Sequence, residues 1–145
     1  MNRKYLTWDD IELAVRIIAH NVRESNIKLT HIKGLQRGGL IPAVMLSHEL
    51  GLPMLESDLG RIDDRVLVVD DICDSGKTLT YYTQFGSPTA TIHYKKSAGL
   101  EPMFWVLNAK EDEVTKLAKS LPDVDKWLIG REVVKVIYVP NKIIN

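Results

Sequence analysis

The sequence predicts an α/β fold with a doubly wound, mainly parallel sheet and helices on both faces. Segments with helical apolar spacing alternate with short β-branched runs, which is the order that parallel strands and crossover helices require. The run Arg65–Val69 contains consecutive apolar residues, as expected for a strand buried on both faces. The pair Gly38–Gly39 separates a predicted strand from a predicted helix, which completes one strand–loop–helix unit.

The elements follow from local signals along the chain. Thr7 can cap a first helix whose apolar residues fall on one face, namely Ile11, Val15, Ile18 and Val22. A strand is expected at Thr30–Leu35 and a helix at Leu40–Leu50, which Gly51 ends. The later elements are a short strand at Pro53–Leu55, the strand at Arg65–Val69 ending at Asp70, a helix from Thr78 to about Phe85, strands at Thr89–Tyr94 and Met103–Leu107, a helix at about Glu111–Ser120 and a last strand at Val133–Val139.

Length and composition predict one domain over residues 1–145, and they exclude several classes of protein. The formal net charge is zero, so no global field favours nucleic acid or an anionic membrane. Cys73 is the only cysteine, which excludes an intrachain disulfide and fits a reducing cytoplasm. Met1–Asp10 lacks the apolar run of a signal peptide, and no later stretch resembles a membrane span, so we expect a soluble cytoplasmic protein.

The segment 66–78 carries the clearest chemical signal. Asp70 and Asp71 follow the predicted buried strand, and ligands bind at that edge of open α/β sheets. Ser75–Thr78 offers hydroxyls, backbone N–H groups and a helix start, while Gly76 allows close approach to an anion. The adjacent acids should point in different directions, so one can hold sugar hydroxyls while the other faces a hydrated Mg²⁺. Together these features predict a site for an activated sugar phosphate.

This segment resembles the phosphoribosyl pyrophosphate (PRPP) signature of the type I phosphoribosyltransferases: four apolar residues, two acids, two variable residues, then Asp-Ser/Thr-Gly-Lys/Gly-Thr. The resemblance implies that Asp70 and Asp71 are the ribose and metal-side acids, with Mg²⁺ as cofactor held by Asp71 through water. It implies that Asp74 is catalytic, near the reacting purine nitrogen. The 5′-phosphate would bind Ser75, Gly76, Lys77 and Thr78.

A second segment, Gly34–Pro42, is similar to the pyrophosphate loop of bacterial xanthine-guanine phosphoribosyltransferases, with Gln36 where serine is usual. Arg37 supplies a fork for phosphate oxygens, and Gly38 and Gly39 permit close approach. The resemblance implies that Gln36, Arg37 and Gly38 bind pyrophosphate and that a non-proline cis peptide joins Gln36 to Arg37.

The base-binding residues are inferred from less specific similarities to the same subfamily. Tyr5–Asp9 resembles its opening, and Thr91–Gly99 resembles its lysine segment, with Lys95 as the contact for a 6-oxo group and Lys96 as the neighbouring alternative. Trp127 would stack on the base, and the backbone of Leu128 would read its 2-position. Alternatively, Trp127 packs in the core or in a surface groove. The usual Pro-Trp-acid sequence that follows is replaced by Gly130-Arg131-Glu132. The resemblance implies a 6-oxopurine transferase and a homo-oligomer.

Three other functions share features of this sequence. A P-loop hydrolase needs a glycine five residues before Gly76, where Asp71 stands. A receiver-type domain needs an acid at the end of a later strand, and Thr89–Tyr94 ends without one. A non-catalytic PRPP or nucleotide binder stays open as the alternative. The related enzymes insert a long covering loop where this chain has only Glu56–Asp64, so we expect a slow transferase.

Overall fold

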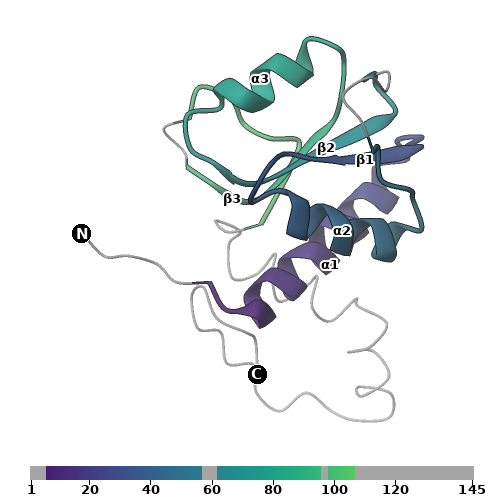
Figure 1. Ribbon diagram of the computed structural model, residues 1–145, viewed down its shortest axis with the longest axis vertical. Helices are drawn as coiled ribbons and strands as arrows, with labels where there is room; N and C mark the ends of the chain where they lie inside the picture. The colour runs from purple at the N-terminus through teal and green to yellow at the C-terminus, as the bar shows by residue number, and fades with distance from the viewer. Residues whose placement is uncertain (1–5, 57–61, 96–97, 107–145) are drawn as a thin grey trace.

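The computed structural model describes residues 6–56, 62–95 and 98–106 as one sheet between two layers of helices. Helix α3 (Lys77–Thr83) lies on one side of the sheet, and helices α1 (Trp8–Glu24) and α2 (Leu40–Leu50) lie on the other (Figure 1). The predicted α/β architecture with helices on both faces is confirmed. The helix expected at Glu111–Ser120 and the strand expected at Val133–Val139 lie outside the described residues. In the described part of the chain, no helix has the length and apolar character of a membrane span.

Among the described residues, four parallel strands form the sheet in the order β1-β2-β3-β4. Their bounds are β1 His31–Gly34, β2 Val66–Cys73, β3 Thr89–Tyr94 and β4 Phe104–Trp105. The strand expected at Pro53–Leu55 is reduced to one parallel bridge between Met54 and Ile32. Ile32 also pairs with Leu67 of β2, so Met54 lies on the opposite edge of β1 from β2.

This bridge explains why the helices cover opposite faces. After β1 the chain passes through α2 and moves outward to Met54, and it then returns past β1 to form β2. After β2 it passes through α3 and moves in the other direction, to β3. Because crossovers between parallel strands are right-handed, connections taken in opposite directions place their helices on opposite faces. The ends of β1 and β2 therefore form the switch point of the sheet.

The ends of both long helices follow the sequence signals. The Thr7 side chain accepts a hydrogen bond from the backbone N–H of Asp10 at 3.2 Å, and the Thr7 N–H donates to the Asp10 carboxylate at 2.7 Å. These two bonds form a capping box. Helix α2 ends at Gly51, whose φ of 65° is the left-handed conformation that glycine adopts at helix ends. The predicted apolar face of α1 is buried at Val15, Ile18 and Val22 and half-buried at Ile11.

Strand β2 corrects the predicted end at Asp70. It continues through Asp70, Asp71 and Ile72 to Cys73 because β3 offers partners beyond Val69, including Thr91 for Asp70 and Tyr94 for Cys73. Acids have low strand propensity, but cross-strand pairing overrides it. Helix α3 is also shorter than expected, beginning at Lys77 and ending at Thr83, and β4 is confined to Phe104–Trp105.

Two buried threonines of β3 provide a matched test of this packing. Thr89 accepts a hydrogen bond from the Met103 N–H at 3.3 Å, whereas the equally buried Thr91 hydroxyl has no partner among the described residues. Replacing an unpaired buried hydroxyl by a methyl group removes a desolvation cost. Thr91→Val should therefore raise the free energy of unfolding by ~1 kcal/mol, and Thr89→Val should lower it by a similar amount. Urea unfolding measures both, and equal losses in the two variants would contradict the assigned partners.

Candidate active site

The two acids of β2 face opposite sides of the sheet edge. Asp70 lines a cavity together with Thr78 and Leu79 at the start of α3. Asp71 lies against the loop before α2, since a Cβ added to Gly38 would overlap the Asp71 carboxylate. The predicted divergence of the two side chains is confirmed, and it follows from the alternation of side chains along a strand. Each acid therefore belongs to a different loop of the site.

Burial raises the pKa of Asp70 from its ordinary 3.8 to about 6, and interactions with the adjacent Asp71 contribute to the rise. The Asp70 carboxylate accepts a hydrogen bond from the Asp71 N–H at 3.0 Å, which acts in the opposite direction. Desolvation and a neighbouring negative charge both disfavour the ionised form. Asp70 is thus ionised at pH 7.5 and becomes protonated as the pH falls through 6.

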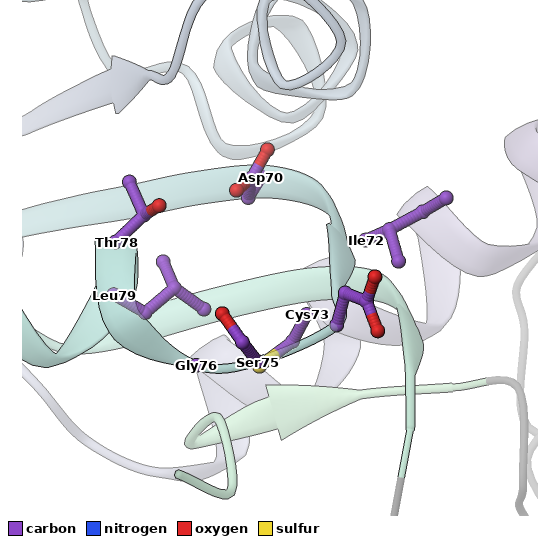
Figure 2. A pocket seen from close by; sticks show the side chains of 8 residues that line it. Asp70, Ile72, Cys73, Ser75, Gly76, Thr78 and Leu79 are labelled. Atoms are coloured by element: carbon purple, nitrogen blue, oxygen red, sulfur yellow. The ribbon is translucent and has the colours of Figure 1, made fainter. Parts of the chain in front are cut away.

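The residues Asp74–Thr78, which we call the motif loop, curve around a cavity of about 90 Å³. Figure 2 shows the hydroxyls of Ser75 and Thr78 on the inner side of this turn. Gly76 caps α3 with a φ of 77°, a conformation that residues with a Cβ rarely adopt. The cavity is too small for a whole nucleotide and suits a single phosphate-sized group.

The loop after β1, Gln36–Gly39, is called here the Arg37 loop. The expected cis peptide joins Gln36 to Arg37. A Cβ on Gly39 would lie 2.8 Å from Cα of Asp70, so the loop backbone rests directly on β2 at Val69 and Asp70. The Leu35 N–H donates to the Val69 carbonyl at 2.9 Å, which fixes the approach. The loop backbone thus lies against the strand that carries the two acids, and the Arg37 side chain is exposed.

Asp74 and Lys95, which the sequence assigns to catalysis and to the base, form an ion pair of 2.6 Å. The Lys95 side chain is 48% exposed and that of Asp74 is 71% exposed, so the pair stands at the surface of the site. Two further base-side residues, Trp127 and Leu128, lie outside the described residues, as do Lys96 and Tyr5. The structure thus brings together the predicted residues of β2, the motif loop, the Arg37 loop and Lys95.

Ile72 is a site residue that the sequence analysis did not identify. It lines the same cavity as Asp70 and Asp74, yet 44% of its surface is exposed. The sequence feature that indicates this position is its spacing two residues after Asp70, because alternate side chains of a continuing strand lie on the same side of the sheet. It was missed because the strand was predicted to end at Asp70.

Cys73 lies beneath the motif loop and is buried. Burial raises the pKa of its thiol, and the negative charge of Asp70 raises it further. Both effects disfavour the thiolate, so Cys73 is poorly suited to act as a nucleophile. The described residues contain no group of three or more His, Cys, Asp or Glu side chains arranged to hold a metal by themselves.

Known proteins are similar to this chain in sequence and in fold. A purine phosphoribosyltransferase structure from Pyrococcus horikoshii is 32% identical, with 73% of this chain and 87% of that chain covered and a TM-score of 0.63. The xanthine-guanine phosphoribosyltransferase of Gluconobacter oxydans is 35% identical over an alignment of 95 residues, and the match covers 50% of this chain and 56% of that protein. This chain therefore spans about half the length of that curated relative.

Other comparisons add less. The leucine–tRNA ligase of Rickettsia bellii is 53% identical over 38 residues, but these are only 5% of that protein and carry no inference about activity. No protein-family profile matches the chain. The Pyrococcus horikoshii structure is decisive because the similarity extends over most of both chains. With this similarity, and with the PRPP signature of β2 and the motif loop at the switch point of the sheet, the chain belongs to the type I phosphoribosyltransferase family.

Proposed function

We propose that the protein transfers the 5-phosphoribosyl group of PRPP to a 6-oxopurine and releases pyrophosphate. The observation that carries the proposal is the meeting of the Arg37 loop, Asp70–Asp71 and the motif loop at one edge of the sheet. The bond from the anomeric carbon to pyrophosphate oxygen breaks, pyrophosphate keeps the electron pair, and a purine nitrogen forms the new bond. Such a reaction requires positioning and electrostatic stabilisation more than a protein nucleophile.

The motif loop would hold the 5′-phosphate of PRPP. Its cavity of about 90 Å³ matches one phosphate group, and the inward hydroxyls of Ser75 and Thr78 are donors for phosphate oxygens. Lys77 supplies positive charge, and the left-handed Gly76 exposes backbone. Asp70, at the opposite wall of the cavity, would accept hydrogen bonds from the ribose hydroxyls.

The Arg37 loop would hold pyrophosphate through Gln36, Arg37 and Gly38. Asp71 fits a hydrated Mg²⁺ here, because its carboxylate lies against Gly38 and Mg²⁺ typically uses one or two carboxylates together with substrate phosphates. When bound, Mg²⁺ would neutralise charge on the departing pyrophosphate. Arg37 would do the same as a bidentate donor to phosphate oxygens.

The Asp74–Lys95 pair favours a 6-oxopurine as acceptor. A purine with a protonated ring nitrogen beside a carbonyl oxygen can donate to Asp74 and accept from Lys95 at once. An amino group at position 6 would instead place a donor against the lysine, which is also a donor. Asp74 would take up the ring proton during transfer, and exposed Ile72 would offer an apolar surface to the base. We infer from sequence similarity that Trp127 and Leu128 contribute contacts to the base.

The proposal includes a slow rate with loss of PRPP to water. Only the nine residues Glu56–Asp64, between Leu55 and Arg65, are available at this point of the chain to cover the reacting centre. An oxocarbenium-like centre reacts with any water that reaches it. The alternative is a PRPP or nucleotide binder without turnover, and stabilisation by PRPP with no nucleotide formed from any base would favour it.

The direct test is to incubate the protein with Mg²⁺, PRPP and separate purine and pyrimidine bases, and to quantify nucleotide and pyrophosphate. We expect nucleotide from 6-oxopurines, pyrophosphate release without any base, and less nucleotide than pyrophosphate when a base is present. Omitting protein gives the background hydrolysis. A yield of one nucleotide per pyrophosphate at high turnover would refute the proposed loss of PRPP to water. If the protein forms no product and PRPP does not stabilise it, the whole proposed function would be refuted.

Asp74→Asn tests the proton-handling role. The amide keeps the shape of the side chain but cannot accept the proton, so kcat should fall about 10²- to 10⁴-fold with the Kd for PRPP within about threefold. Asp70→Asn is the matched comparison, because it should weaken PRPP binding itself. Single-turnover kinetics and equilibrium titration separate the two effects. A kcat within twofold of the wild type would remove Asp74 from catalysis.

The raised pKa of Asp70 predicts a pH dependence of PRPP binding. Asp70 is ionised above pH 6 and accepts hydrogen bonds; below pH 6 it becomes neutral and loses that capacity. Between pH 7.5 and 5.5 the ionised fraction falls about fourfold, so the Kd for PRPP should rise by about that factor. In Asp70→Asn, any change of the PRPP Kd with pH comes from the titration of PRPP and not of residue 70. The dependence of the Kd on pH in the wild type is compared with the dependence in this variant. Identical slopes in both proteins would contradict the assignment.

A further inference from the structure

The Cys73–Gly76 backbone is supported by a second segment that the family signature does not include. The Lys95 N–H donates to the Cys73 carbonyl at 3.0 Å, which extends the pairing of β2 and β3 beyond their last residues. The Gly99 N–H donates to the Ser75 carbonyl at 3.2 Å. Consecutive parts of the signature are therefore bonded to a distant part of the chain.

Leu100 adds two contacts to the same turn. A Cβ on Gly76 would lie 2.8 Å from both N and Cβ of Leu100, so the two backbones are packed as closely as a glycine allows. The buried Cys73 thiol donates to the Leu100 carbonyl at 3.5 Å. Leu100 also packs in the apolar cluster that contains Leu79 of α3. Leu100 therefore packs against the motif loop and restricts its position.

The supporting segment is joined to the base-side lysine. The Ala98 N–H donates to the Lys95 carbonyl at 2.8 Å, and the Lys95 ammonium contacts Asp74 at 2.6 Å. The Arg37 loop has other supports, since it rests on Val69, Asp70 and Asp71. A substitution that breaks a contact of the Ala98–Leu100 segment should therefore change the conformation of the motif loop, while the Arg37 loop keeps its contacts.

We propose that Ala98–Leu100 is a positioning segment for the motif loop and that the Gly99 N–H is the contact that fixes the loop's phosphate-binding shape. The inference rests on the proposed function, because it assigns the 5′-phosphate to the motif loop. Removing this hydrogen bond should weaken ligands that carry a 5′-phosphate. It should leave the affinity for pyrophosphate, which binds the Arg37 loop, unchanged.

The test compares Gly99→Pro with Gly99→Ala by calorimetric titration of guanosine 5′-monophosphate and of pyrophosphate, both with Mg²⁺. Proline removes the N–H, whereas alanine keeps it and fits, because its Cβ would lie 3.6 Å from the Ser75 carbonyl oxygen. We expect Gly99→Pro to raise the Kd for the nucleotide about tenfold, or ~1.4 kcal/mol, with pyrophosphate within about twofold. Gly99→Ala should bind both ligands like the wild type.

Cys73→Ala provides a second variant if Gly99→Pro does not fold. It removes the thiol donor to Leu100 and should raise the nucleotide Kd about threefold, because a thiol is a weak donor. Unchanged nucleotide binding in a folded variant, or equal weakening of both ligands, would overturn the positioning role. A wild-type protein that binds neither ligand would instead refute the proposed function, and the inference with it.

Discussion

The handedness of crossovers between parallel strands is the constraint on which the site depends. Met54 pairs on one edge of β1 and β2 pairs on the other, so the chain reverses its direction across the sheet after Met54. Right-handed connections then send α2 and α3 to opposite faces, and the loops that precede them diverge from adjacent strand ends (Figure 1). A ligand entering between these loops meets the Arg37 loop on one side and the motif loop on the other.

The extension of β2 through Cys73 divides the chemistry between these loops. Because side chains alternate along a continuing strand, the Asp70 side chain faces the α3 side of the sheet and the Asp71 side chain faces the α2 side. An irregular loop after Val69 would not determine the direction of either side chain. The arrangement has an electrostatic cost, because two adjacent carboxylates at a partly buried edge repel each other, which contributes to the raised pKa of Asp70. Hydroxyl donors or a cation would offset that cost, which supports the proposed ribose and Mg²⁺ ligands of these two acids.

Local signals predicted most of the fold, and non-local contacts account for the differences. Thr7, Gly51 and the β-branched run of β3 act within a few residues, and the elements they define were placed correctly. The end of β2 was misplaced because it depends on partners about twenty positions later in the chain. The PRPP signature located the acids and the motif loop, but neither the exposure of Ile72 nor the support from Leu100 has a sequence signal of its own.

The Asp74–Lys95 ion pair orders two exposed side chains without making a large contribution to stability. Both side chains are largely exposed, and ion pairs in such positions contribute only ~0–1 kcal/mol to stability because water screens them. A base that donates to the carboxylate and accepts from the ammonium replaces each partner with a hydrogen bond, so separating the pair costs little. The backbone bonds from Lys95 to Cys73 and from Gly99 to Ser75 do not depend on this pair. These two side chains can therefore rearrange while the motif loop keeps its shape.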